Sequence, residues 1–482
     1  MNSIYKYVVP ALSAFILGTG SAQASTPVFS TYPKSTPRLS PEVRDYTTTC
    51  NKGVVRLFSV LPPRTKAFLN GRVLRPGTHS ILSKLSPGQR LHVQARYGKK
   101  NLDYSIRCIP RGFPSFKANG LLPASMPWVA LASTNVGAVL GPYAIVVDRR
   151  GVPIWWKYTA GYNVMDVKGL PNGRIGFWSG LLNSDHAEGS FTVYNNKGQL
   201  QKSVATIGSL EDAHDSQLAP DGSWYRMVLN WHLDADLSSL GEPAHAVWDD
   251  QLQQIGTDGA VKWSWNALDH VSPADGLRWY GVLKATTIGT DPLDLFHLNS
   301  IEQAGQNDLI ISMRHMDAVY RIRKSDGKIL WKLGGATTPE SLTVLNDARY
   351  PGQPFAGQHD ARLQADGTLT VYDNGTGVTG RAPRATRWQI DAQAHTARLV
   401  EEITDPQATW SAAGGSARRM SDGSWIISWS HSPYIKAYSK SHKLIWNFKI
   451  AATSYRAQPI PLSYNSRAAM VSGMDFMNPI PR

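Results

Sequence analysis

The chain has 482 residues, more than one ordinary domain holds, and it is rich in Gly (41), Pro (30) and Trp (16). Its 50 basic and 36 acidic residues give a net charge of +14, scattered along the chain rather than massed in one tail or helix. This balance favours an anionic substrate or an anionic surface. The chain has no nucleic-acid recognition motif, so we do not expect it to bind nucleic acid.

The first 24 residues have the pattern of a secretory signal peptide. A lone Lys6 precedes the apolar run from Val8 to Leu17, and the small-x-small triplet ending at Ala24 predicts cleavage before Ser25. An uncleaved membrane anchor is the alternative, but the apolar run is short for a span of ~20 residues. We therefore expect an exported protein, located in the periplasm.

Short alternating apolar runs and the lack of any convincing helical periodicity predict an all-β protein. Residues 25–39 are rich in Ser, Thr and Pro and are expected to be extended. Residues 40–115 are predicted to form a small β-sandwich, followed by a linker over 112–123. The only two cysteines, Cys50 and Cys108, are a plausible disulfide in an oxidising compartment.

From about residue 126 onward the sequence repeats itself. Turns that end in Gly and lead into a β run alternate with short strands that end in Trp, such as "GVPIWW" and "GKILW". This alternation gives about six four-stranded units, which start near residues 126, 162, 213, 296, 358 and 414. The pattern predicts a six-bladed β-propeller over 124–460 with a C-terminal tail over 461–482, and an array of β-sandwiches is the alternative.

Histidine recurs at one position of the repeat. His214, His297 and His359 each lie eight residues before the glycine of the following turn, and two other units have Met165 and Gly415 at this position. The first strand of every propeller blade lines the central channel, so equivalent positions converge on the axis. We therefore expect the three imidazoles to face one another.

A hairpin that turns near Gly305 pairs residues whose numbers sum to about 611, which places Arg314 across from His297. Asn299, two residues after His297, is expected on the same face of that strand. Three histidines also suit zinc. A fixed guanidinium would repel a dication and offers a planar fork to a sulfate or phosphate oxyanion, so we expect neither metal nor cofactor.

Other polar residues are weaker candidates. His232, His315 and His431 lie near the ends of second strands, where they could line the rim of the channel or be structural. Asp215 and Asp360 directly follow two of the axial histidines, where they could orient them or could serve a turn. A structural role as a buried polar group is also open for each single axial histidine.

Residues 294–335 and 355–375 resemble the arylsulfotransferase family of bacterial propellers. The resemblance depends on the His-x-Asn-Ser element at 297–300, the Ser-x-Arg-His element at 312–315 and the Gln-His-Asp-Ala-Arg element at 358–362. It is strong over about 205–380 and weaker elsewhere. In that family a histidine takes the sulfuryl group from a phenolic sulfate ester and passes it to a second phenol, without a nucleotide sulfate donor.

The resemblance implies roles for individual residues. His359 would be the nucleophile, while Arg314, His297 and His214 would bind the sulfuryl oxygens and assist proton transfer, with Asn299 beside the site. A homodimer is also implied. An insertion between Trp231 and Gly259 departs from the family pattern and leaves the acceptor open.

Interleaved aromatic residues, Trp231, Phe296 and Phe355, could form walls for an aryl ring, although each could also be structural packing. Three other functions remain possible at this point. They are a propeller that binds an anion or a partner without catalysis, a sulfate-ester hydrolase and a quinone-dependent dehydrogenase. The last would be expected to have more blades and an adjacent cysteine pair, and the chain has no such pair.

Overall fold

The computed structural model describes residues 26–50, 53–133, 141–182, 187–208, 210–286 and 291–479. The expected signal peptide therefore lies outside the described residues. The chain forms two compact units. The first contains the described residues up to Leu85 together with Leu91–Ile106, and the second contains Ser86–Arg90 and the described residues from Arg107 onward.

The N-terminal unit is built on two antiparallel sheets, as predicted for the small β-sandwich. One sheet has the order β1 (Val28–Tyr32), β3 (Val54–Leu61), β6 (Gly77–Lys84). The other has the order β2 (Asp45–Thr49), β8 (Lys100–Ile109), β7 (Arg90–Tyr97), β4 (Lys66–Leu69), β5 (Arg72–Leu74). Alternate residues of β7 are buried because successive side chains of a strand point to opposite faces.

Two details of this region bear on the sequence predictions. The segment expected to be extended contains strand β1, which pairs with β3. Cys50 and Cys108 are disulfide-bonded, which confirms the predicted pair.

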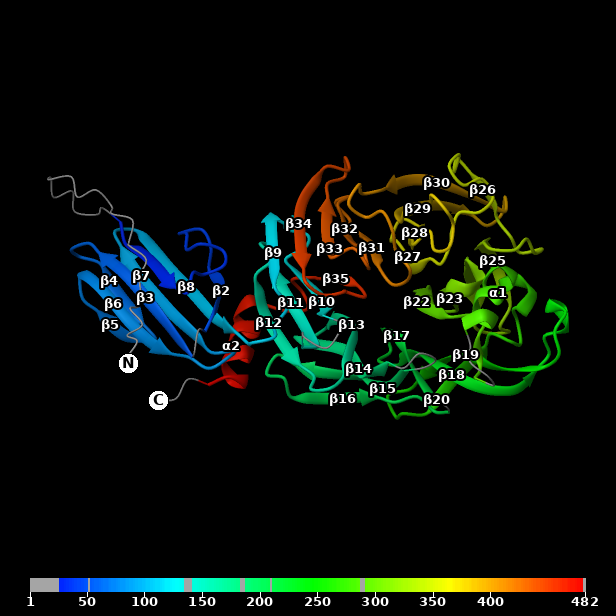
Figure 1. Cartoon of the computed structure of the whole chain (residues 1–482), viewed down its shortest axis with the longest axis horizontal. Helices are drawn as coiled ribbons and strands as arrows, with labels where there is room; N and C mark the ends of the chain where they lie inside the picture. The colour runs from blue at the N-terminus through cyan, green and yellow to red at the C-terminus, as the bar shows by residue number, and fades with distance from the viewer. Residues whose placement is uncertain are drawn as a thin grey trace, which may run out of the picture. The chain divides into compact units, whose positions relative to one another are not determined.

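The second unit is a six-bladed β-propeller, which confirms the predicted fold. Five blades begin with an inner strand near a predicted repeat start: β13 (Asn163–Leu170), β17 (Leu210–Leu218), β22 (Leu298–Ala304), β27 (His359–Leu363) and β31 (Ser416–Arg419). In the sixth, the inner strand is β35 (Ala457–Ile460), which pairs with β10 (Trp128–Ser133). Figure 1 shows these six inner strands around a common centre.

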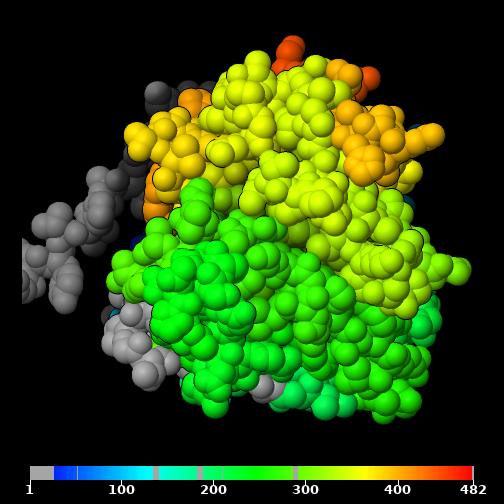
Figure 2. Space-filling model, turned by 90° about the vertical axis from the view of Figure 1, so that its right-hand side faces the viewer, coloured from blue at the N-terminus to red at the C-terminus, as the bar shows by residue number. Residues whose placement is uncertain are grey.

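The remaining strands complete the blades in sequence order. They are β11 (Tyr143–Asp148), β12 (Pro153–Tyr158), β14 (Arg174–Leu182), β15 (Ala187–Asn195), β16 (Leu200–Val204), β18 (Trp224–Ala235), β19 (His245–Ile255), β20 (Val261–Asn266), β23 (Asp308–Met313), β24 (Ala318–Arg323), β25 (Ile329–Gly334), β28 (Thr368–Asp373), β29 (Arg384–Asp391), β30 (Thr396–Ile403), β32 (Trp425–Ser428), β33 (Tyr434–Tyr438) and β34 (Leu444–Ile450). Short strands β21 (Leu293–Asp294) and β26 (Thr343–Leu345) add to two blades in parallel. In Figure 2 the green and yellow segments of neighbouring blades pack side by side.

The structure differs from the sequence predictions at three places. Residues 116–120, expected within a linker, form strand β9 (Phe116–Gly120), which pairs with β34 at the outer edge of the last blade. Two α-helices, α1 (Leu277–Thr286) and α2 (Arg467–Met477), were not predicted because ten or eleven residues give too short a periodic pattern. Helix α2 begins at the cap Ser466, lies in the expected tail and buries Met470 and Met474 in the core of the first blade.

Among the described residues, no helix is both long enough and apolar enough to span a bilayer.

Candidate active site

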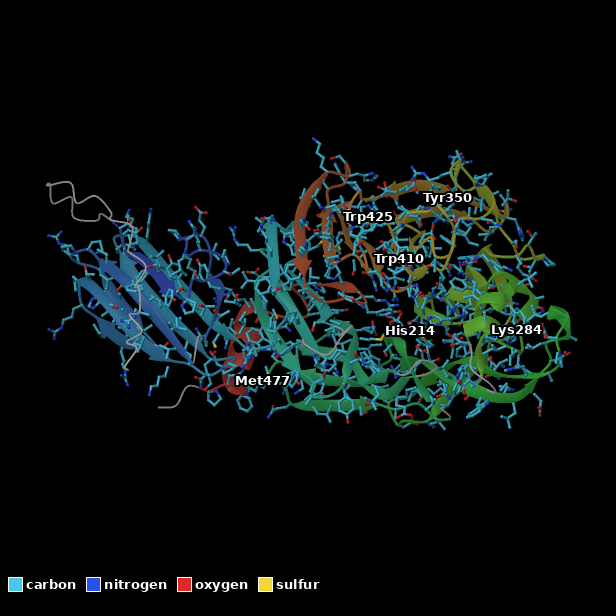
Figure 3. All side chains as sticks on the ribbon, in the orientation of Figure 1. His214, Lys284, Tyr350, Trp410, Trp425 and Met477 are labelled. Carbon is cyan, nitrogen blue, oxygen red and sulfur yellow. The ribbon has the colours of Figure 1, made fainter. Side chains whose placement is uncertain are left out.

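The three predicted histidines meet at the centre of the propeller. The ring centroids of His214 and His297 are 4.7 Å apart. The ring centroid of His359 lies 6.5 Å from that of His214 and 6.4 Å from that of His297. His359 is fully buried, whereas the side chains of His214 and His297 keep 18% and 21% of their exposure. Figure 3 labels His214 in the propeller. The prediction that these imidazoles face one another is therefore confirmed.

The backbone is irregular where the three histidines lie, so their side chains depart from the regular alternation of a β-strand. The register shifts between Glu211 and Ser216 around His214, and again just after His359. His297 has a positive φ of 54° directly before strand β22. Such bulges re-aim side chains, and here they lie in the strands that carry the histidines.

The proton of His359 can be placed from its neighbours. The backbone amide of Gly414 donates to Nε2 of His359 at 3.1 Å, so Nε2 carries a lone pair. In the neutral ring the proton then lies on Nδ1, which donates to the carbonyl oxygen of Gly357 at 3.1 Å. No carboxylate contacts this imidazole among the described hydrogen bonds and ion pairs.

His214 and His297 differ from His359 because each has a carboxylate partner. Nδ1 of His214 lies 2.8 Å from the carboxylate of Asp212, and Nδ1 of His297 is hydrogen-bonded to Asp294. A carboxylate at Nδ1 fixes the tautomer with the proton on Nδ1 and leaves Nε2 as the nitrogen that can accept a further proton. These two imidazoles can therefore hold a proton at Nε2, whereas His359 is arranged to stay neutral.

Arg314 lies beside the histidines, as the hairpin arithmetic predicted. Its backbone amide donates to the carbonyl oxygen of His297 at 3.0 Å. Its Nη2 donates to the carbonyl oxygen of Ala412 at 2.8 Å, its Nη1 donates to Nε2 of His315, and its guanidinium lies 4.2 Å from the ring centroid of Trp279. Its Nε is buried and has no partner among the described residues.

The pKa values follow from burial and from the mutual repulsion of cations. Burial lowers the pKa of His359 well below its ordinary value, and Arg314 and the two other histidines lower it further. Burial also lowers the pKa of His297, against the raising effect of Asp294. Burial lowers the pKa of Arg314 to about 10, which still leaves the guanidinium charged at neutral pH.

His315, a weaker candidate in the sequence, holds the guanidinium of Arg314 through a hydrogen bond. Burial holds its pKa well below the ordinary value, so the ring is neutral. Its Nδ1 donates to the carbonyl oxygen of Asp294, which leaves Nε2 to accept from Arg314. Of the other weaker candidates, His232 lies 3.6 Å from Asp249 and His431 contacts Trp410.

The other predicted residues lie around this cluster in different ways. Asn299 is buried, its Nδ2 donates to the carbonyl oxygen of Gln358 at 2.9 Å, and its Oδ1 has no partner among the described residues. Phe296 and Phe355 belong to hydrophobic cores between blades, and Trp231 is 53% exposed and packs against Trp248. None of the three has a described ring contact with a site histidine.

Sequence reasoning missed several residues that complete the site. Tyr455 lies 5.6 Å from His214 and 6.1 Å from His359 between ring centroids, and burial raises the pKa of its phenol. Trp279 comes from helix α1, and Asp212 and Asp294 precede their histidines by two and three residues. The spacing Asp-x-His and Asp-x-x-His could have indicated the two carboxylates.

Asp215 and Asp360 join neighbouring blades rather than orient the imidazoles. Asp215 accepts from the amide of Ile301 in the next blade, and Asp360 accepts from the amide of Ala417 in the blade after its own. Arg456 contacts both carboxylates at 3.3 Å. This buried network, in which every described charge has an opposite partner, fixes the inner strands that carry the histidines: Asp166, Lys168, Asp215, Asp360, Arg362, Arg418 and Arg456.

Two groups of side chains have the donor atoms that a metal ion requires. They are His214 with His297 and His359, and Asp294 with His297 and His315, each with its nitrogen or oxygen atoms within 4.8 Å of one another. In both groups the Arg314 guanidinium is close enough to lower the pKa of a histidine, so it would also repel a dication. An oxyanion fits this charge better.

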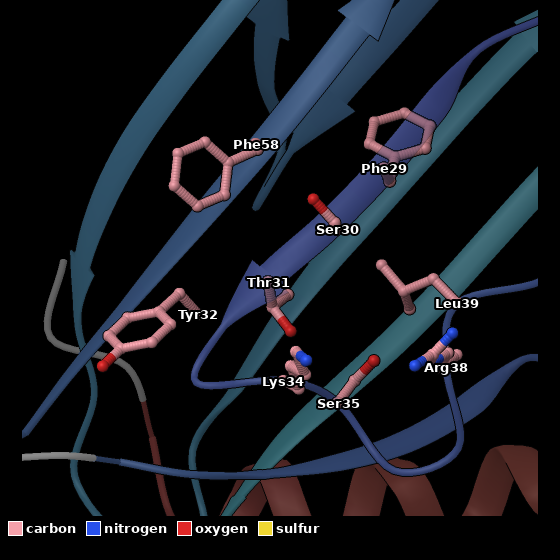
Figure 4. A pocket seen from close by; sticks show the side chains of 9 residues that line it. All are labelled: Phe29, Ser30, Thr31, Tyr32, Lys34, Ser35, Arg38, Leu39 and Phe58. Carbon is pink, nitrogen blue, oxygen red and sulfur yellow. The ribbon is translucent and has the colours of Figure 1, made fainter. Parts of the chain in front are cut away.

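A pocket of about 380 Å³ lies in the N-terminal unit and contains none of these residues. Figure 4 shows its lining, in which Phe29, Phe58 and Tyr32 accompany the cations Lys34 and Arg38.

The sequence model of the arylsulfotransferase (ASST) family matches residues 168–451, more than half of the chain. A comparison with curated proteins found no match.

Several solved structures resemble the chain at low identity. A protein of unknown function from Bacteroides caccae is 11% identical, with 69% of this chain and 99% of that chain covered and a TM-score of 0.42. Virginiamycin B lyase from Staphylococcus aureus is 11% identical over 71% and 97% of the two chains, with a TM-score of 0.35. The Dos1 propeller is 8% identical over 84% and 91%, with a TM-score of 0.32.

Proposed function

Because the chain belongs to the arylsulfotransferase family, we propose that it moves the sulfuryl group of a phenolic sulfate ester to a second phenol through a sulfohistidine on His359. The observation that carries this proposal is a difference among the three imidazoles. His214 and His297 each have a carboxylate partner at Nδ1, whereas Nε2 of His359 accepts from a backbone amide and its ring has no carboxylate partner among the described residues.

The first step uses the lone pair on Nε2 of His359, which attacks the sulfur atom of the donor. The bond between sulfur and the phenolic oxygen breaks, and its electron pair leaves with the phenolate. A neutral imidazole is a competent nucleophile, and the lowered pKa keeps His359 neutral near pH 7. The carbonyl oxygen of Gly357 accepts a hydrogen bond from Nδ1–H and so stabilises the ring while it carries the sulfuryl group.

The buried, unpartnered Nε of Arg314 supports the binding of sulfuryl oxygen. A buried donor without a partner costs roughly 1–3 kcal/mol, and an oxyanion at this place would satisfy it. His315, the carbonyl of Ala412 and the face of Trp279 hold the guanidinium in position before the substrate arrives. Such preorganised donors act where charge develops in the transition state.

His214 and His297 are assigned to proton transfer. Either one gives the proton on Nε2 to the leaving phenolate and becomes neutral. In the second step the same nitrogen takes the proton of the acceptor phenol, whose oxygen attacks sulfur. The nitrogen–sulfur bond then breaks and its electron pair returns to Nε2 of His359.

The test is mass spectrometry of the protein after brief exposure to 4-nitrophenyl sulfate. We expect an acid-labile sulfuryl adduct on the peptide that contains His359, and its absence in His359→Asn. An adduct on the peptide of His214 or His297 instead would refute the assignment of the nucleophile.

Product analysis separates transfer from the other functions. With added phenol we expect phenyl sulfate, formed at the rate at which 4-nitrophenol is released. Release of inorganic sulfate at an unchanged rate would identify a hydrolase. Stoichiometric binding without turnover would identify an anion-binding propeller.

A further inference from the structure

We propose that Trp410, with His431 behind it, forms the wall against which the aromatic ring of the substrate stacks, and so selects aryl over alkyl sulfuryl donors and acceptors. This inference rests on the proposed function and assigns a specificity residue to the same site.

The loop that follows Trp410 is attached to the catalytic groups. The carbonyl oxygen of Ala412 accepts from Nη2 of Arg314 at 2.8 Å, and the amide of Gly414 donates to Nε2 of His359 at 3.1 Å. Asn374 holds the loop in place, because its Nδ2 donates to the carbonyl oxygen of Gly414 at 3.1 Å. The loop is therefore anchored to both the proposed nucleophile and the proposed anion-binding group within four residues of Trp410.

Trp410 itself is exposed and belongs to none of the hydrophobic cores formed by the described residues. All 16 tryptophans lie in the described part of the chain, and of these only Trp231 and Trp410 are exposed, at 53% and 61%. The Trp410 ring contacts His431 edge to face, with 4.9 Å between centroids. The amide of Ala412 donates to Nδ1 of His431 at 3.3 Å, so the same loop orients the partner ring.

The distance fits an aryl sulfate. Two residues of chain span at most about 7 Å, so the backbone of Trp410 lies within this distance of the Ala412 carbonyl that contacts Arg314. When the sulfuryl oxygens of a donor are bound at Arg314, its ring must lie outside the imidazole cluster. Trp410 offers an apolar aromatic face in that neighbourhood, and aromatic pairs favour stacked or edge-to-face packing.

The experiment measures binding and turnover in Trp410→Ala and Trp410→Phe. Benzenesulfonate is the binding probe, because its carbon–sulfur bond cannot be transferred, and methanesulfonate is the matched probe without a ring. We expect Trp410→Ala to bind benzenesulfonate about threefold to tenfold more weakly and methanesulfonate as the wild type does, with Trp410→Phe close to the wild type. In turnover, KM for 4-nitrophenyl sulfate or phenol should rise while the rate of adduct formation at saturation changes little.

The control is Phe476→Ala, which removes another exposed aromatic ring, 53% exposed, from helix α2. We expect it to leave both affinities unchanged. Equal affinity of Trp410→Ala and the wild type for benzenesulfonate would overturn the inference even if sulfuryl transfer is intact. If the affinity for benzenesulfonate depends on Trp410 but the wild type transfers no sulfuryl group, the proposed function is refuted and the role of Trp410 in binding the aromatic ring still holds.

Discussion

The backbone amide of Gly414 donates a hydrogen bond to Nε2 of His359, the atom that we propose attacks sulfur. This bond must open before the nucleophile can react. The amide that is released then lies next to the new nitrogen–sulfur bond, where it can donate to a sulfuryl oxygen. In the proposed mechanism, the amide of Gly414 thus binds Nε2 in the resting state and becomes a hydrogen-bond donor to the sulfuryl group after the attack.

We predict that Gly414→Ala slows sulfuryl transfer by about 100-fold, the effect of losing one oxyanion donor. Gly414 has a φ of 71°, and an added Cβ would lie 3.2 Å from both Ser430 and Tyr455, so the amide would be displaced. Single-turnover release of 4-nitrophenol measures the effect. Gly380→Ala is the control, because its φ of 76° gives similar strain with nothing within 4 Å, and it should keep full activity.

Arg314→Lys should reduce kcat/KM for 4-nitrophenyl sulfate by at least 100-fold, because one ammonium group cannot replace the donors of a planar fork. In Arg314→Gln, which removes the positive charge, the acid limb of the pH profile should also move to higher pH, since the charge of Arg314 lowers the pKa of His359. Arg278→Lys is the matched control, because Arg278 stacks on the same Trp279 ring at 4.4 Å but pairs with Asp317. Equal losses in both variants would contradict a specific role for Arg314.

The pH dependence of the first step should depend on the leaving group. The lowered pKa of His297 means that its acid form becomes more populated as pH falls from 8 to 6. His359 stays neutral over this range because its pKa lies well below the ordinary value. We therefore expect kcat/KM for phenyl sulfate to rise from pH 8 to pH 6 and that for 4-nitrophenyl sulfate, whose leaving group needs little protonation, to stay flat.

The stability of the protein should fall as the pH drops below about 6.5, the unfolded pKa of histidine. The pKa values of His297, His315 and His359 are lowered in the folded state, so the unfolded chain binds more protons in this range. Each histidine can contribute up to about 1.4 kcal/mol per pH unit until its folded pKa is reached. Urea unfolding at pH 7 and pH 5 measures this loss, which should be smaller in His359→Gln; an unchanged loss would contradict the neutral state of His359.

Repetition explains what could be predicted from the sequence. The blades repeat a pattern, so the position of His214, His297 and His359 in that pattern was sufficient to place them together on the axis. In the hairpin of β22 and β23, Leu298 pairs with Met313. Their numbers have the same sum, 611, as those of His297 and Arg314, the pair expected from the sequence.

The residues that were missed lie outside the repeat. Trp279 belongs to a helix inserted between two blades, and Tyr455 precedes the strand that closes the ring. Strand β9 is separated in the chain by more than 300 residues from its partner β34, and no local sequence pattern predicts such a pair. Asp212 lies in β17 where its register shifts, and Asp294 lies in the two-residue strand β21, so the two-residue period of a longer strand gives no guidance to either carboxylate.

The ring is closed by β35, and Arg456 directly before it donates to the carbonyl oxygens of both His214 and Asn299. A chain whose synthesis has not reached Arg456, or one that has been cleaved before it, therefore lacks the side chain that joins the segments of His214 and Asn299. The arrangement of the three imidazoles, which come from earlier blades, is complete only when this later arginine is in place.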